Sequence, residues 1–289
     1  MQQLVARAPA KVNLTLRVLR RRKDGFHDLA SLVVFAGAAD LLTLEPGPAL
    51  ALDVRGPRAE ASGPCADNLV LTAARALAAH IPGLRVGRFQ LTKRLPVEAG
   101  LGGGSSDAAA ALRLLAQVND LSLDDPRLFD AARSVGSDVP VCLDPRARMM
   151  QGVGDILSAP VALPPLFAVL VNCGTAVATP QVFRAIGLSP GEALAGPTHP
   201  EVLPQQIDAL LEVLAAIPND MEPAAIRLAP DIGSAMALLA EAPGVRLVRM
   251  SGSGATVFAL MQDCRHAARL ARRIALARPD WWVRPTVLR

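Results

Sequence analysis

Apolar and polar residues alternate along the first extended stretch of the chain. Val12, Leu14, Leu16 and Val18 would form one face, and Lys11, Asn13, Thr15 and Arg17 the other. This period of two predicts a half-buried strand within residues 5–19, where Lys11 would ordinarily be a solvated lysine on the polar face. Asp24 and Gly25 then mark a tight turn before the apolar run 29–35, so the two runs predict a hairpin.

The rest of the chain predicts strands and helices in mixed order. Further strands are expected over residues 40–44, 50–54, 86–91, 139–143, 167–171, 245–250, 256–260 and 282–287. Helices are expected over residues 69–80, 105–118, 124–134, 205–216, 221–229, 232–241 and 264–277, and a further helix is expected to begin at residues 179–183. Asp67 or Asn68 would cap the first of these helices. Residues 151–155 suggest a hinge or crossover, and the Pro- and Gly-rich residues 187–204 suggest a loop.

One stretch stands out from this pattern, because Gly100, Gly102, Gly103 and Gly104 fall within five residues. Such a run suits neither a helix interior nor a strand, since each glycine costs backbone entropy. Three N-cap residue types, Ser105, Ser106 and Asp107, and an Ala/Leu-rich segment follow, which predicts a glycine loop that leads into a helix N-terminus. Backbone N–H groups and the helix dipole would then favour an anion such as phosphate.

Known phosphate-binding loops do not match this stretch. Ser105 stands where the P-loop pattern needs lysine and where the dinucleotide pattern, started at Gly100, needs glycine. A glycine-rich surface turn before an ordinary helix is therefore the alternative interpretation. A second glycine loop is expected at residues 251–254.

Composition narrows the class of protein. With 289 residues, 51% of them apolar, the chain is long enough for two domains and a large core. Aromatic residues make up only 3%, without a single tyrosine, so that core must consist of Ala, Leu and Val. The net charge of +4 is mild and suits an anionic small ligand as readily as nucleic acid.

Scattered cysteines and histidines indicate neither disulfides nor a metal cluster. Cys65, Cys142, Cys173 and Cys264 form no C-x-x-C pair and are expected to be buried thiols in a reducing compartment. Residues 1–11 lack the apolar segment of a signal peptide, and no run approaches the ~18 apolar residues of a membrane helix. We therefore expect a soluble, cytoplasmic protein.

Two further features carry charge on predicted turns. Asp138 follows Gly136 and Ser137, where a helix cap or Asx-turn is the alternative to a chemical role. The basic run 20–23 could bind nucleic acid, but so short a run is more often a solvated loop.

Three segments together resemble the signature motifs of the GHMP small-molecule kinases. They are residues 9–14, 95–110 and 250–258. Residues 23–29, 136–140, 178–180 and 218–222 further resemble one branch of that family, whose substrate is a cytidine diphosphate alcohol of isoprenoid precursor synthesis. The resemblance extends from about residue 6 to residue 287.

This resemblance implies a two-domain α+β GHMP kinase fold with the active site in the cleft between the domains. Residues 1–155 would form the ATP-binding N-terminal domain, which resembles domain 2 of a ribosomal protein, and residues 156–289 a ferredoxin-like α/β substrate-side domain. ATP would be bound by Pro96, Val97, Glu98, Ala99, Gly100, Leu101, Gly102, Gly103, Gly104, Ser105 and Ser106, with Asn68 and Lys93 near the adenosine.

The resemblance also assigns the chemistry. Asp138 would accept the proton of the substrate's 2-hydroxyl group, and Lys11 would hold Asp138 and the attacking oxygen. Asn13, Phe26, His27, Thr179 and Phe183 match substrate-side positions, with Phe26 and Phe183 on the cytosine ring and from different domains. Ser106 could contact a phosphate-bridging Mg²⁺ or cap the helix, and both Phe rings could instead fill small local cores.

Two residues depart from the family pattern. Phe26 stands where the family has tyrosine, which keeps the stacking face but loses a hydroxyl group. Glu98 places a carboxylate in the phosphate loop, so we predict that its side chain points to solvent.

Three other functions stay open at this point. The chain could be a mevalonate, homoserine or sugar kinase of the same family, although residues 24–27 argue against this. A nucleotide-binding regulator would not need both Lys11 and Asp138, and an RNA-binding protein would be expected to hold more aromatic and basic residues. The expected partner is thus a small molecule with a cytidine diphosphate group, and neither nucleic acid nor a membrane is expected to bind. The protein itself is expected to be a monomer or a weak homodimer.

Overall fold

The computed structural model describes residues 3–289. Met1 and Gln2, which belong to the N-terminal segment discussed above as a possible signal peptide, lie outside the described residues. The chain forms two compact units whose segments alternate. Unit 1 holds the described part of Met1–Lys11 together with Ala38–Val97 and Gly102–Pro145, and unit 2 holds Val12–Gly37, Glu98–Leu101 and Arg146–Arg289. The predicted domain limits 1–155 and 156–289 stay a prediction.

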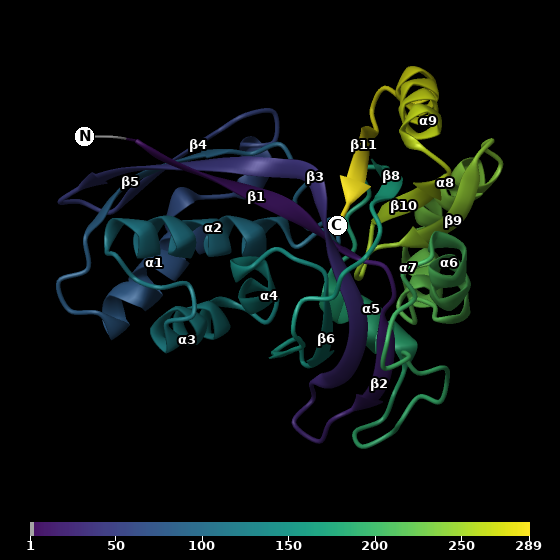
Figure 1. Ribbon diagram of the computed structural model, residues 1–289, viewed down its shortest axis with the longest axis horizontal. Helices are drawn as coiled ribbons and strands as arrows, with labels where there is room; N and C mark the ends of the chain where they lie inside the picture. The colour runs from purple at the N-terminus through teal and green to yellow at the C-terminus, as the bar shows by residue number, and fades with distance from the viewer. Residues whose placement is uncertain (1–2) are drawn as a thin grey trace. The chain divides into compact units, whose positions relative to one another are not determined.

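In its described residues, unit 1 combines β-strands with α-helices (Figure 1). β4 (Ala51–Arg55) pairs in parallel with β5 (Val86–Thr92), and β5 pairs antiparallel with residues 41–47 of β3 (His27–Gly47). β1 (Leu4–Asn13) also pairs with β3. Helices α1 (Leu69–His80) and α2 (Gly103–Val118) pack on each other, with α3 (Pro126–Val135) against α1 and α4 (Val139–Leu143) against α2. Two short 3-10 helices, Glu60–Ser62 and Cys65–Asp67, precede α1.

Unit 2 is built on antiparallel strands (Figure 1). β8 (Leu166–Asn172) lies between β11 (Trp282–Leu288) and β10 (Thr256–Met261), and β9 (Val245–Met250) pairs with the other edge of β10. Apolar residues of α8 (Pro230–Ala240) and α9 (Cys264–Ala277) share one core with β8 and β10. Helices α5 (Thr179–Ile186), α6 (Ile207–Ala216) and α7 (Glu222–Leu228) complete the unit.

A hairpin extends from the first half of β3 in unit 2. β2 (Arg17–Arg21) pairs antiparallel with β3 around the turn at residues 22–26, which confirms the predicted hairpin. β6 (Arg148–Gly152) pairs with the same part of β3 and turns back into β7 (Ile156–Leu157). The expected hinge or crossover at residues 151–155 is therefore wrong, because this segment is a hairpin turn.

Helix caps explain why several boundaries follow from the sequence. Asn68 caps α1 by accepting a hydrogen bond from the N–H of Val70, as predicted. Helix α2 instead begins at Gly103 after Gly102 in the left-handed region, so Ser105, Ser106 and Asp107 lie inside the helix and do not cap it. The predicted strand 139–143 is wrong as well. It is α4, in which Pro140 occupies the first turn, where a missing N–H is tolerated.

The predicted half-buried strand is wrong in its burial. Lys11, Asn13, Thr15 and Arg17 are all buried, as are the apolar residues between them. Packing therefore covers both faces of this segment, and its polar side chains have to find partners inside the protein. The cysteine prediction also fails in part, because Cys142 is buried but Cys65 and Cys264 are exposed.

Candidate active site

Lys11 and Asp138 form an ion pair in unit 1, with Lys11 Nζ 3.0 Å from Asp138 Oδ2. Lys11 comes from β1 and its side chain is 5% exposed, whereas Asp138 precedes α4 and its side chain is 32% exposed. The ammonium group therefore fixes a carboxylate that solvent can still reach. Such a carboxylate can accept a proton from a bound molecule.

Gly102 of the glycine loop packs on the Lys11 side chain. A Cβ atom at Gly102 would lie 3.0 Å from Cε of Lys11, so a larger residue at this position would displace the Lys11 side chain. Gly102 also has φ 57°, a backbone conformation that favours glycine. The ion pair and the start of α2 are therefore adjacent.

The N-terminus of α2 is suited to bind an anion. The first N–H groups of a helix have no carbonyl partner in a preceding turn, and Gly102 has no side chain to cap them. Together with the helix dipole, these groups attract phosphate. In the same loop Glu98 is exposed, which confirms the prediction that its side chain points to solvent.

Ser106 faces the protein interior. Its hydroxyl group is buried, donates to the carbonyl oxygen of Pro9 at 2.6 Å and lies 3.3 Å from Sγ of Cys142. Burial raises the pKa of the Cys142 thiol to about 12, so the group beside Ser106 is a neutral thiol. Ser106 is therefore engaged within the protein in this arrangement, and its predicted contact with Mg²⁺ stays a prediction. Within residues 3–289, no group of three or more His, Cys, Asp or Glu side chains could hold a metal ion.

Lys93 is buried between the carboxylates of Asp40, for which the sequence predicted no role, and Asp107, which was expected only as an N-cap residue type. Its Nζ lies 2.6 Å from Asp40 Oδ2 and 2.6 Å from Asp107 Oδ2. Burial alone would lower the pKa of Lys93, but the two carboxylates outweigh it and raise that pKa. Burial raises the pKa of Asp107 to about 7, although Lys93 opposes this shift. Asp40 could have been suspected from its position as a lone carboxylate beside an apolar run.

The predicted adenosine contacts of Lys93 and Asn68 stay predictions. The structure gives both residues an internal role, since Lys93 is buried and Asn68 caps α1.

The middle of the glycine loop, residues 98–101, packs on the second glycine loop in unit 2. Ser251 Oγ donates to the carbonyl oxygen of Gly100 at 2.9 Å and accepts from the N–H of Asn13 at 3.2 Å. Thr256 N–H donates to the carbonyl oxygen of Ala99 at 3.1 Å. Asn219 supports the second loop, because its Nδ2 donates to the carbonyl oxygens of Met250 and Gly252. The first loop is therefore held by the Ser251 hydroxyl group and by the backbone N–H of Thr256.

The predicted substrate-side residues gather in unit 2. The rings of His27 and Phe183 stack with their centroids 4.3 Å apart and 14° between their planes. Phe26, which precedes His27 in the chain, is 62% exposed, and Thr179 Oγ1 lies 2.7 Å from Ser253 Oγ. Asn13 is fully buried and donates to Ser31 Oγ at 2.7 Å.

One expectation about the aromatic residues changes. Phe26 and Phe183 were expected to come from different domains, but both belong to unit 2. The ring of His27 covers one face of the Phe183 ring. Burial and the charge of Arg21 lower the pKa of His27, which favours the neutral ring.

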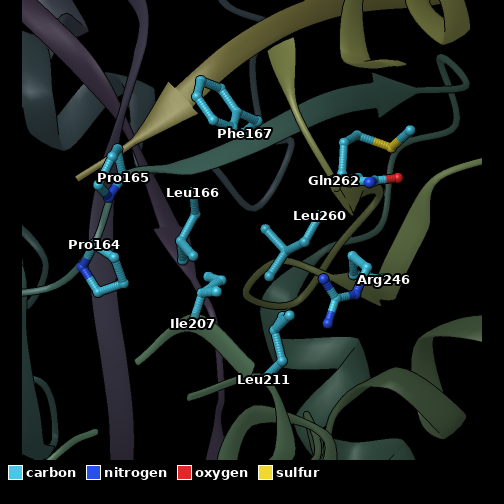
Figure 2. Close-up of a pocket in the computed structure, with 10 residues that line it drawn as sticks. Pro164, Pro165, Leu166, Phe167, Ile207, Leu211, Arg246, Leu260 and Gln262 are labelled. Carbon is cyan, nitrogen blue, oxygen red and sulfur yellow. The ribbon is translucent and has the colours of Figure 1, made fainter. Parts of the chain in front are cut away.

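A separate hollow of about 210 Å³ lies elsewhere in unit 2 (Figure 2). Its lining is Pro164, Pro165, Leu166, Phe167, Ile207, Leu211, Arg246, Leu260, Met261 and Gln262. Arg246 is already paired with Asp208 at 2.6 Å, and most of the other walls are apolar. The hollow therefore does not suit a phosphate group, and it contains none of the predicted site residues.

The chain belongs to the GHMP kinases, a family of ATP-dependent small-molecule kinases. The family model described as "GHMP kinases N terminal domain" matches residues 68–144, and the one described as "GHMP kinases C terminal" matches residues 202–278. The predicted two-domain α+β GHMP kinase fold is thereby confirmed, while the cleft between the domains stays a prediction.

Relatives of the whole chain share one more specific name, 4-diphosphocytidyl-2-C-methyl-D-erythritol kinase. The protein of that name from Xanthobacter autotrophicus is 68% identical over 293 residues, and the one from Azorhizobium caulinodans is 65% identical over 289 residues. Each alignment covers 100% of both chains. The predicted branch of the family is thus confirmed.

Solved structures agree with this assignment. A crystal structure of 4-(cytidine 5'-diphospho)-2C-methyl-D-erythritol kinase matches with a TM-score of 0.78 and 37% identity, covering 98% of this chain and 99% of that one. A homoserine kinase from Cytophaga hutchinsonii matches with a TM-score of 0.68 at 18% identity, covering 99% and 94%. This second likeness shows the shared fold alone.

Within residues 3–289 no helix has the length and apolar character needed to cross a membrane.

Proposed function

We propose that this kinase transfers the γ-phosphoryl group of ATP to the 2-hydroxyl group of 4-diphosphocytidyl-2-C-methyl-D-erythritol, a step of the non-mevalonate isoprenoid precursor pathway. The observation that carries the proposal is the Lys11–Asp138 ion pair, packed against Gly102 at the start of α2. The full-length relatives of the same kinase name support the choice of substrate.

Phosphoryl transfer depends mainly on positioning and on charge stabilisation. The N–H groups at the start of α2 would bind the phosphates of ATP, with residues 96–106 as the loop around them. Asp138 would accept the proton of the 2-hydroxyl group as its oxygen attacks the γ-phosphorus atom and ADP leaves. Lys11 would hold Asp138 in place and stabilise the negative charge on the attacking oxygen.

The cytidine end of the substrate would bind in unit 2. Phe183 would stack on the cytosine ring, with Phe26 at the other face of the base, and Asn13, His27 and Thr179 would line the same side. Because the His27 ring already covers one face of Phe183, the base has to use the other face or displace His27. Mg²⁺ would accompany ATP, held chiefly by phosphate oxygens and water, since Ser106 is turned inward. The proposal also includes a cytoplasmic location and a monomeric or weakly dimeric state of the protein.

A coupled assay of ATP consumption tests this function. We expect turnover with the cytidine diphosphate alcohol and none with mevalonate, homoserine or a sugar. The Asp138→Asn variant is the control for the site, because it keeps the size of the side chain and removes the base. Turnover of another alcohol by the unmodified protein would assign it a different substrate.

A further inference from the structure

A buried ion triad connects the two ends of the glycine loop. Asp40, in β3, accepts hydrogen bonds with Oδ1 from the N–H groups of Arg94 and Leu95, where the loop begins. Asp107 lies in α2, directly after the loop. Lys93 Nζ joins the two carboxylates at 2.6 Å each.

The two carboxylates act only inside the protein. The side chains of Asp40, Lys93 and Asp107 are 0%, 4% and 3% exposed, so neither carboxylate can touch a bound nucleotide. Lys93 also lies directly beneath the loop, since a Cβ atom at Gly103 would be 3.2 Å from its Nζ. A displacement of Lys93 would therefore move the first N–H groups of α2.

Stability does not explain this triad. A buried ion pair seldom stabilises a fold more than apolar residues of similar size would. Here two carboxylates share one ammonium group, and Asp107 Oδ1 is buried without a hydrogen-bond partner. The arrangement does, however, set the distance between residue 95 and the first turns of α2.

We propose that Asp40 and Asp107 are positioning residues for the ATP phosphates, which act through Lys93 by fixing both ends of the glycine loop. The inference rests on the proposed function, because it requires that this loop binds ATP. Groups that bind a reacting phosphate must be held within about 0.5 Å, and a 1 Å displacement can cost ~100-fold in rate. A rigid connection beneath the loop supplies this accuracy.

The test uses Asp107→Ala, the conservative variant Asp107→Asn and, as a second site, Asp40→Asn. Leu77→Ala is the matched control, because Leu77 is fully buried in α1, outside the loop and the triad, and its truncation should destabilise unit 1. The measurements are Kd for ATP by calorimetry, KM for both substrates, and Tm.

We expect Asp107→Ala to raise Kd and KM for ATP by about 10-fold or more, with little change in KM for the alcohol. Asp107→Asn should restore much of the affinity, because its side chain can still accept a hydrogen bond from Lys93. Leu77→Ala should lower Tm and leave Kd for ATP within about twofold.

Two results would overturn the positioning role alone. The first is that the Asp107→Ala and Asp40→Asn proteins fold and bind ATP with the same Kd as the unmodified protein. The other is a loss of ATP affinity in Leu77→Ala as large as in Asp107→Ala, since the effect would then follow stability. An unmodified protein that binds no ATP would overturn the proposed function, and the positioning role with it.

Discussion

Replacing Gly100 with alanine should push residues 98–101 of the first glycine loop away from the second glycine loop, residues 251–254. Gly100 has φ +72°, and a Cβ atom there would lie 2.2 Å from the carbonyl oxygen of Ser251 and 2.8 Å from that of Gly254. Both are backbone atoms that cannot rotate away, so one loop has to move. The hydrogen bond from Ser251 Oγ to the carbonyl oxygen of Gly100 would be lost as the loops part.

The expected cost is the sum of two effects. A non-glycine residue in the left-handed region costs ~1–2 kcal/mol, and the lost hydrogen bond costs ~0.5–1.5 kcal/mol. Together they predict a loss of about 1.5–3.5 kcal/mol in the free energy of unfolding. Gly174→Ala is the matched control, because Gly174 has φ +85° with nothing within 4 Å of a Cβ atom. It should show the backbone cost alone.

Urea denaturation measures the free energies of unfolding, and calorimetry measures ATP affinity. We expect Gly100→Ala to lose more stability than Gly174→Ala and also to bind ATP more weakly, since residues 98–101 belong to the proposed phosphate loop. If both variants lose the same stability and bind ATP equally well, the backbone packing of the two loops does not position the nucleotide.

Three further predictions concern single side chains. Asp138→Asn should fold and lose ~10²–10⁴-fold in kcat, as expected for loss of a general base, and near-normal kcat in a steady-state assay would remove Asp138 from catalysis. Phe183→Ala should raise KM for the cytidine substrate ~5–150-fold, with KM for ATP unchanged, because stacking of a base on an aromatic ring contributes ~1–3 kcal/mol. A lower Tm with unchanged KM would instead make Phe183 a core residue. Burial, and secondarily the charge of Arg17, lowers the pKa of His199 to about 4 from 6.5, so the unfolded chain binds a proton in this window that the folded protein does not. The stability of the unmodified protein relative to His199→Gln should therefore fall as the pH is lowered from 6.5 towards 4, and a pH-independent difference in urea denaturation would contradict this.

Local chemistry accounts for what could be predicted from the sequence alone. Asn68 before an Ala/Leu-rich run determines where α1 begins, because an N-cap needs only its own helix. The turn at residues 22–26 likewise determines the hairpin of β2 and β3. The family motifs predicted that Lys11 and Asp138 act as a pair, although they lie far apart in the sequence. The structure places Lys11 Nζ 3.0 Å from Asp138 Oδ2.

Local chemistry also explains why the predicted start and cap of α2 were wrong. Ser105, Ser106 and Asp107 are good N-cap residues, yet Gly102 takes the cap position. A left-handed backbone at Gly102 starts the helix earlier, and packing then turns Ser106 towards Pro9.

Only the tertiary structure decided which polar residues are buried and what they bind. Periodicity placed Lys11 and Asn13 on a polar face, but it cannot show that other parts of the chain cover that face. Lys93 meets Asp40 and Asp107 from positions 53 and 14 residues away, and no local pattern encodes such a meeting. The reason is that a buried charge is tolerated only where a partner compensates its desolvation, and the fold alone determines which partner lies within reach.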